Sequence, residues 1–199
     1  MNNYANLTVG VLALQGAVSE HCLQIEQLGA KAVIVKNPED LIACDGLVLP
    51  GGESTAIGKL MRKNGLFEAI KAFHAQGKGL FGTCAGMILL AKQLTGDPTV
   101  HLGLMDIEVQ RNAFGRQIDS FQMELAIKGL IESFPAVFIR APYIVNFNAE
   151  KVESLAEFEG HTVLAKQGNL LACSFHPELT ANKAVMGLFL DILRSEGNS

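Results

Sequence analysis

Short apolar runs recur through the first half of the chain and predict β-strands. Most of the runs are rich in valine, leucine or isoleucine, and all of them are too short for a helix of ordinary length. A strand that is apolar along its whole length is typical of a sheet covered on both faces. The runs occupy residues 7–14, 31–36, 45–50 and 77–83.

Segments with apolar residues at helical spacing lie between and after these runs. Strands that alternate with helices predict right-handed crossovers and a mostly parallel sheet with helices on both of its faces. The fold class is therefore α/β. The predicted helices cover residues 17–28, which Gly29 closes, then 56–63 and 66–76, and a further helix begins at Cys84.

From about residue 104 to residue 174 the pattern changes to short β-type pieces. The chain then ends in an amphipathic pattern over residues 181–194, which predicts a helix with Thr180 as its N-cap. The predicted strands of this second half are residues 104–110, 120–127, 136–140, 143–147, 161–167 and 169–175.

Composition indicates one globular domain over residues 1–199, because no linker rich in proline, glycine or serine divides the chain. Hydrophobic residues make up 49% of the sequence and charged residues 18%, which is enough for an extensive core. The net charge is -4, with both signs scattered along the chain. This gives no electrostatic footprint for nucleic acid or an anionic membrane, so a small ligand is favoured.

The N-terminal segment lacks the basic region of a signal peptide, and no uncharged apolar run reaches the roughly 18 residues of a spanning helix. A cytoplasmic protein is therefore expected. The four cysteines form no CxxC pair, and the five histidines have no metal-ligand spacing. We expect free thiols, no metal and no cofactor.

Cys84 lies in the segment GTCAG, residues 82–86, where a predicted strand turns into a predicted helix. Small residues on both sides let strand and helix approach around a strained turn, so the segment is the thiol counterpart of the nucleophile elbow of hydrolases. The helix N-terminus favours the thiolate, and the Ala85 N–H can face an oxyanion. These features predict a nucleophile for acyl transfer; the alternative is a cysteine that only packs in the core.

A cysteine nucleophile needs a base, and His176 is the histidine that has a carboxylate at a useful spacing, in SFHPEL, residues 174–179. Pro177 disfavours α conformation at His176, so the chain is expected to be extended there, with His176 and Glu178 on the same side. Glu178 can then orient the imidazole, and a preceding strand brings His176 to the sheet edge where Cys84 lies. An ordinary surface turn is the alternative interpretation of these residues.

The remaining cysteines and histidines are interpreted as packing or surface residues. They are Cys22, Cys44 and Cys173, and His21, His74, His101 and His161.

The segment LPGGEST, residues 49–55, follows a predicted strand and ends in Ser54 and Thr55, either of which can cap a helix. Its spacing does not fit the phosphate-binding pattern GxxxxGK[ST], which excludes an ATP site of that kind. A glycine pair can turn a backbone N–H toward a bound carbonyl and so supply a second oxyanion donor. A simple glycine-rich turn is the alternative.

The elbow cysteine, the glycine-pair loop and the C-terminal His-x-Glu, in this order on an α/β chain, resemble the class I (triad-type) glutamine amidotransferases. Within that class, six segments are similar to the glutaminase subunits of pyridoxal 5'-phosphate synthase. These are LALQGAVSEH (12–21), LPGGEST (49–55), GTCAGMILLA (82–91), QRNAFGRQ (110–117), IRAPYI (139–144) and SFHPEL (174–179). The resemblance implies a flavodoxin-like three-layer sandwich.

The resemblance also implies an activity and a partner. Members of the family hydrolyse L-glutamine to L-glutamate and ammonia through a glutamyl thioester. The ammonia passes to a separate synthase subunit in a hetero-oligomeric complex, and that subunit joins it to a pentose phosphate and a triose phosphate to make the vitamin B6 cofactor.

Roles for individual residues follow from the resemblance, position by position. Cys84 is the nucleophile, His176 the base and Glu178 the residue that orients it. Gly52 and Ala85 are the expected oxyanion donors, and Gln15 lies near the face that docks the synthase. The residues expected to bind glutamine are Gly52, Glu53, Ser54, Arg111, Ile139 and Arg140.

Three other interpretations remain open at this level. The nearest is the glutaminase subunit that serves histidine biosynthesis, although the segment LQGAVSEH favours the first interpretation. A cysteine hydrolase or peptidase on a related fold would also use an elbow cysteine. A binding or regulatory subunit with a vestigial triad is the third, and the intact triad residues argue against it.

Overall fold

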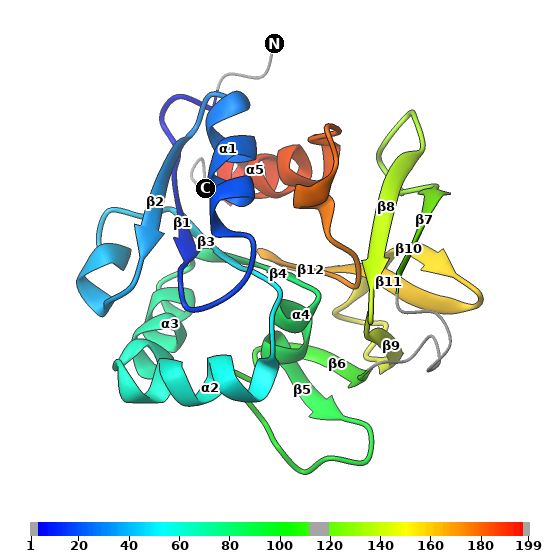
Figure 1. Cartoon of the computed structure of the whole chain (residues 1–199), viewed down its shortest axis with the longest axis horizontal. Helices are drawn as coiled ribbons and strands as arrows, with labels where there is room; N and C mark the ends of the chain where they lie inside the picture. Colours follow the sequence, from blue (N-terminus) through cyan, green and yellow to red (C-terminus); the bar gives the residue numbers. More distant parts are fainter. Residues whose placement is uncertain (1–3, 112–119, 197–199) are drawn as a thin grey trace.

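Residues 4–111 and 120–196 are described by the computed structural model. Within these ranges the strands form a ten-stranded mixed sheet and a separate two-stranded hairpin, and helices cover both faces of the sheet (Figure 1). The predicted α/β class and its mostly parallel central sheet are confirmed. None of the helices in these ranges is long and apolar enough to cross a lipid bilayer.

The first half of the sheet is parallel, with the strand order β2-β1-β3-β4-β12. The chain adds β2 on one side of β1 and then continues on the other side with β3, so the strand order reverses at β1. In open α/β sheets, ligands bind beyond the carboxyl ends of the strands near such a reversal. These strands are β1 (Thr8–Leu12), β2 (Lys31–Val35), β3 (Gly46–Leu49), β4 (Gly79–Thr83) and β12 (Leu170–Cys173).

The second half of the sheet is mostly antiparallel. Two of its strands, β5 and β10, are not predicted by the sequence pattern, because half or more of the residues of each are polar. The strands are β5 (Ala91–Leu94), β6 (Met105–Gln110), β9 (Tyr143–Phe147), β10 (Glu153–Phe158) and β11 (His161–Gln167). The separate hairpin consists of β7 (Ser120–Leu125) and β8 (Phe134–Ile139).

Two apolar cores lie on opposite faces of the sheet. Alternate residues of each strand point to opposite faces, so Leu47 and Leu49 contribute to one core while Val48 contributes to the other. Helices α2, α3 and α4 cover the first core, and α1, α5 and the β7–β8 hairpin cover the second (Figure 1). The α-helices are α1 (Val18–Gln27), α2 (Ser54–Lys63), α3 (Leu66–Ala75), α4 (Ala85–Leu90) and α5 (Ala184–Glu196), and the 3-10 helices are η1 (Pro38–Leu41) and η2 (Pro177–Leu179).

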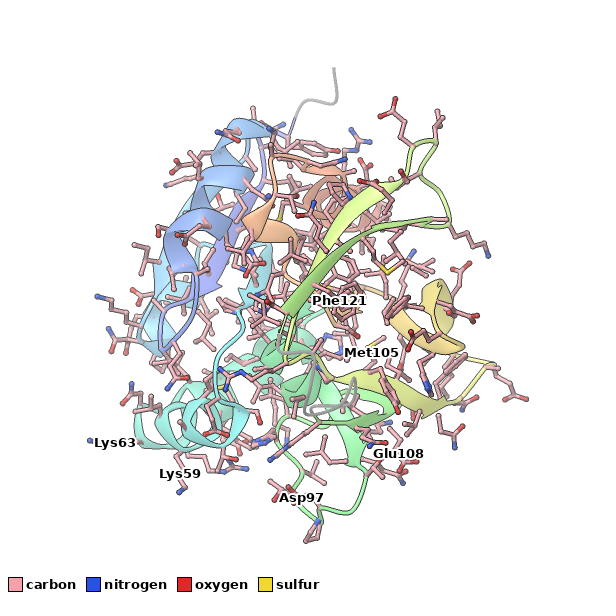
Figure 2. The ribbon with its side chains drawn as sticks, turned by 45° about the vertical axis from the view of Figure 1, so that its right-hand side comes forward. Lys59, Lys63, Asp97, Met105, Glu108 and Phe121 are labelled. Atoms are coloured by element: carbon pink, nitrogen blue, oxygen red, sulfur yellow. The ribbon has the colours of Figure 1, made fainter. Side chains whose placement is uncertain are left out.

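Aromatic packing holds the hairpin against the sheet. Phe121 of β7, labelled in Figure 2, stacks on Phe138 of β8 at a centroid distance of 4.7 Å. Phe138 in turn meets the edge of Phe175, at 5.6 Å, on the chain segment that follows β12. Pairs of this geometry add to area burial in stabilising a contact. The hairpin is thereby anchored beside the segment that carries His176.

The helix α2 is amphipathic and begins two residues earlier than predicted. Ile57 and Met61 are buried, whereas Lys59 and Lys63 are exposed and point away from the sheet in Figure 2. Capping by Ser54 or Thr55 is wrong, since the N-cap is Glu53.

The start of the last helix also differs from the prediction. Helix α5 begins at Ala184, and the carbonyl of Lys183 accepts its first helical hydrogen bond. The Oδ1 atom of Asn182 accepts the Ala184 N–H at 2.9 Å, while the Thr180 hydroxyl donates to the Asn182 carbonyl. The prediction of Thr180 as the N-cap is therefore wrong, because its hydroxyl stabilises the turn before the helix instead.

We predict that Asn182→Ala lowers the free energy of unfolding by about 1 kcal/mol, since it removes the acceptor at the start of α5. Urea unfolding followed by circular dichroism measures the change. Asn64→Ala is the matched control, because Asn64 is exposed and no hydrogen bond of its side chain occurs within the described part of the chain. Equal stability of Asn182→Ala and the native chain would contradict the assignment.

Candidate active site

Four loops meet at the carboxyl edge of the parallel strands. Gln15 follows β1, Gly52 follows β3, Cys84 follows β4 and His176 follows β12. A cavity of about 580 Å³ opens at this edge. Its lining residues are Gly52, Glu53, Ser54, Cys84, Ala85, Ile88, Arg111, Ile139, Arg140, Pro142 and His176.

This cavity brings together nearly all of the site residues that the sequence predicts. Glu178 and Gln15 do not line it, but each contacts a residue that does. Ile88 and Pro142 line the cavity as well, although the sequence pattern does not single them out, because apolar side chains of this kind occur throughout the chain.

The turn at Cys84 is strained and tightly packed. Cys84 has a φ of 49° and a ψ of -106°, a conformation that L residues adopt at a cost of about 1–3 kcal/mol. A Cβ atom added at Gly82 would lie 2.4 Å from the Gly86 carbonyl oxygen, and one added at Gly86 would lie 2.0 Å from the Leu49 carbonyl oxygen. Only glycine therefore fits on either side of the elbow.

Backbone contacts hold the cysteine and the histidine at neighbouring strand ends. The Cys84 N–H donates to the Cys173 carbonyl at 2.8 Å, which continues the parallel pairing of β4 with β12. The His176 N–H donates to the Val137 carbonyl of the hairpin, also at 2.8 Å.

Gly51 lies between the two side chains. A Cβ atom there would come within 2.7 Å of His176 Cε1 and 3.5 Å of Cys84 Cβ. The absence of a side chain at this position leaves the imidazole and the sulfur next to each other. The sequence pattern indicates a glycine pair but does not show this reason for its first member.

The contact between His176 and Glu178 forms as predicted, but by a different local structure. His176 Nδ1 lies 2.8 Å from Glu178 Oε1, and the Glu178 side chain is fully buried. The prediction of an extended chain through these residues is wrong, because Pro177–Leu179 forms a 3-10 helix. One turn of that helix, and not strand alternation, brings the carboxylate back to the imidazole.

Burial and hydrogen bonding act in opposite directions on both groups. Burial lowers the pKa of His176, but hydrogen bonding with Cys84 and Glu178 outweighs it and raises the pKa to about 10. Burial raises the pKa of Glu178, and the hydrogen bond with His176 together with the nearby imidazole of His21 reverses this, so that the pKa is lowered overall. The arrangement therefore favours an imidazolium between the sulfur and a carboxylate.

Two backbone N–H groups lie beside the cysteine, those of Ala85 and Gly52. Neither has a hydrogen-bond acceptor among the described residues. Ala85 is the first residue of α4, so its N–H has no partner within the helix. Gly52 has a φ of 141°, which favours glycine. Its neighbour Glu53 donates its N–H to Gln15 Oε1 at 2.9 Å, so Gln15 holds the glycine-pair loop.

Glu53 lines the cavity and also caps a helix. Its two carboxylate oxygens accept the N–H groups of Thr55 and Ala56 at 3.0 and 2.7 Å. Burial acts to raise the pKa of Glu53, but these backbone donors lower it overall. Ser54, the next residue, is buried and also borders the cavity.

Two arginines contribute positive charge to the cavity. Arg111 Nη2 lies 3.3 Å from Asp97 Oδ2, in the loop after β5 that Figure 2 marks by Asp97. Arg140 has a φ of 41°, an uncommon value outside glycine, at the end of β8.

The carbonyl oxygen of Ile139 lies 3.9 Å from Cys84 Sγ. The segment 110–117 that resembles the family extends past Arg111 into residues 112–119, which lie outside the described residues.

The sequence interpretation missed two polar residues behind the carboxylate. His21 and Gln24 are both buried on α1, and His21 Nε2 lies 3.5 Å from Glu178 Oε2. Their spacing of three residues, which puts both on one face of a helix with the apolar Ile25 beside them, was the available signal. All four cysteines are free, as predicted.

Comparison with known proteins gives consistent matches along nearly the whole chain. The model of the SNO glutamine amidotransferase family matches residues 11–194. A curated protein named pyridoxal 5'-phosphate synthase subunit PdxT, from Pasteurella multocida (strain Pm70), is 68% identical over 192 residues, which cover 96% of this chain and 100% of the relative. A protein of the same name from Bacillus velezensis is 55% identical over 184 residues, 92% of this chain and 93% of the relative.

Solved structures give the same result. One described as a glutamine amidotransferase has a TM-score of 0.88 and 46% sequence identity, and the match covers 94% of this chain and 98% of that one. The structure of PurLQS from Thermotoga maritima has a TM-score of 0.68 at 14% identity, with 96% and 97% covered, and shows a shared fold alone.

We predict that the imidazole of His176 titrates near pH 10 in the native protein and at lower pH in Cys84→Ala, because the sulfur is one source of the raised pKa. Since this value lies above the ordinary value of 6.5, the interaction stabilises the fold fully below that pH and is lost as the pH rises through about 10. Nuclear magnetic resonance of ¹⁵N-labelled histidines measures both titrations.

The signals of His74, on the distant helix α3, serve as the internal control and should be the same in both proteins. A His176 midpoint that does not move when the sulfur is removed would show that the two side chains are not coupled.

Proposed function

The chain belongs to the SNO glutamine amidotransferase family, and from this we propose that its cavity hydrolyses L-glutamine and that the ammonia is used to make pyridoxal 5'-phosphate. The protein is a glutaminase, a hydrolase that yields L-glutamate and ammonia. The observation that carries the site assignment is the strained Cys84 elbow at the cavity, with His176 and the buried Glu178 beside it.

In the first chemical step the Cys84 sulfur attacks the side-chain amide carbon of glutamine. His176, beside the sulfur, takes the thiol proton, and its raised pKa favours the imidazolium that results. The amide oxygen becomes an oxyanion in the tetrahedral intermediate. The Ala85 and Gly52 N–H groups are the proposed donors to it, because neither has another acceptor among the described residues.

In the second step the carbon–nitrogen bond breaks and ammonia leaves. His176 gives its proton to the leaving nitrogen, which leaves a glutamyl thioester on Cys84 and a neutral imidazole. Glu178 stabilises the imidazolium and keeps Nδ1 as the donor to its own oxygen, so that Nε2 is the nitrogen that exchanges protons. Water, deprotonated by the neutral imidazole, then hydrolyses the thioester to L-glutamate and restores the starting pair.

The amino-acid end of glutamine needs opposite charges for its carboxylate and its ammonium group. Arg111 or Arg140 is proposed to pair with the carboxylate, as a guanidinium does with two parallel hydrogen bonds. Glu53 and Ser54 provide oxygen atoms at the cavity wall beside Gly52, and Ile139 provides a backbone carbonyl near the sulfur.

The proposed partner is the synthase subunit of pyridoxal 5'-phosphate synthase, in a hetero-oligomeric complex, since the curated relatives are named as subunits of that enzyme. Gln15 is proposed to lie at the docking face, because it holds the glycine-pair loop at the rim of the site. A cytoplasmic location and a single domain over residues 1–199 remain predictions from the sequence.

We predict that Cys84→Ala reduces glutamine hydrolysis by about 10⁴-fold or more, because it removes the atom that forms the thioester. Glutamate release, measured with and without the synthase subunit, should rise with the partner in the native chain and not in Cys84→Ala. Cys44→Ala is the matched control, since this buried cysteine lies away from the cavity. Unchanged hydrolysis in Cys84→Ala would remove the nucleophile assignment, and peptide cleavage without glutaminase activity would favour a peptidase.

We predict that His176→Asn keeps the fold but does not accumulate the thioester, because no group then protonates the leaving nitrogen. Mass spectrometry of acid-quenched reactions detects the glutamyl adduct in the native protein, and circular dichroism checks the fold of the variant. Thioester formation at the native rate in His176→Asn would contradict the role of this residue.

A further inference from the structure

Helix α1 lies against the 3-10 helix η2, which carries the carboxylate of the site, and holds its backbone. Gln24 Nε2 donates to the carbonyls of Pro177 and Thr180, at 2.9 and 3.1 Å. These two bonds bracket Glu178 on either side in sequence. The helix therefore fixes the turn from which the carboxylate projects.

One turn earlier on the same helix, His21 faces the carboxylate itself. Glu178 Oε1 is occupied by His176, whereas Oε2 lies 3.5 Å from His21 Nε2, and the side chains of His21 and Glu178 are both fully buried. Within the described residues Oε2 has no hydrogen-bond partner. A buried carboxylate with one oxygen unsatisfied is costly, so a donor at this position has a large effect.

The surroundings of His21 determine which nitrogen carries the proton. Burial lowers the pKa of His21 more than the Glu178 carboxylate raises it, which favours the neutral imidazole. Nδ1 has no partner in the described part of the chain, while Nε2 faces the carboxylate and the Thr83 hydroxyl at 3.4 Å. The tautomer with hydrogen on Nε2 satisfies an acceptor, and the other tautomer would turn a lone pair toward a negative charge.

The titratable groups around this contact come from four elements. They are Glu178 of η2 and His176 just before it, Cys84 at the end of β4, Cys173 of β12, and Glu20 on α1 itself.

We propose that His21 is a positioning residue of the site: its Nε2–H donates to Glu178 Oε2 and holds the carboxylate in the orientation that His176 requires. The proposal rests on the glutaminase function above. The 3.5 Å separation is longer than an ordinary hydrogen bond, and such contacts are often long in the free enzyme and shorten as substrate binds. His21 also touches the strand end that leads into Cys84, through Thr83, so it connects the carboxylate to the nucleophile's strand.

The test compares His21→Leu with His21→Gln, assayed with the synthase subunit present. A glutamine amide can place its nitrogen near the position of Nε2, whereas leucine removes the donor. We expect His21→Leu to lower kcat by about 10- to 100-fold, by analogy with the groups that orient metal-binding histidines, with KM nearly unchanged. His21→Gln should keep most of the activity.

The pH profile of kcat/KM distinguishes a positioning role of His21 from a merely structural one. In His21→Leu the carboxylate loses a donor that favours its ionised form, so the acid limb of kcat/KM should move to higher pH. In His21→Gln and in the control His74→Gln, on the distant helix α3, the acid limb should stay in place.

Two further measurements distinguish a failure of the His21 proposal from a failure of the proposed glutaminase function. If the native chain does not hydrolyse glutamine while Cys84→Ala behaves identically, the function fails. Nuclear magnetic resonance of the native protein still tests His21 alone, because long-range ¹⁵N couplings identify the protonated nitrogen. Hydrogen on Nε2 supports the proposal even if His21→Leu does not fold. Hydrogen on Nδ1, or a native kcat and pH profile in folded His21→Leu, would overturn it.

Discussion

The pairing of β4 with β12 is the constraint on which the site depends. One strand comes from the middle of the chain and the other from near its end, and their parallel register sets Thr83 opposite Cys173. The hydrogen bond from the Cys84 N–H to the Cys173 carbonyl extends that register by one residue. Because parallel strands end at the same edge, the nucleophile and the histidine loop leave the sheet side by side.

The strained turn at Cys84 and the burial of the Glu178 carboxylate both cost free energy, and the rest of the fold offsets that free energy. The positive φ of Cys84 persists because the backbone at Gly82 and Gly86 packs directly on neighbouring carbonyl groups. Glu178 is withdrawn from water, and its ionised form persists because His176 and the polar side of α1 surround it. The two apolar cores supply the rigidity that holds these groups at fixed distances.

The fold could be predicted well where periodicity was strong and poorly where it was weak. The strands β1 and β3, in which Thr8 is the one polar residue, follow directly from their sequence pattern. The half-polar strands β5 and β10 do not, since their pairing with β6 and β11 supplies the order that their own residues lack. Helix starts were wrong at α2 and α5, because several residues in each segment could cap and tertiary packing selected among them.

The sequence by itself determined the chemistry: a cysteine between glycines, a histidine followed two positions later by a glutamate, and a glycine pair after a strand. These are local patterns, and each states which groups are available. Only the tertiary structure decided that Gly51 leaves room for the imidazole beside the sulfur, that a 3-10 turn carries Glu178 back to His176, and that His21 stands behind the carboxylate. Such contacts join residues far apart in the chain, and their distances depend on how the sheet and helices pack together.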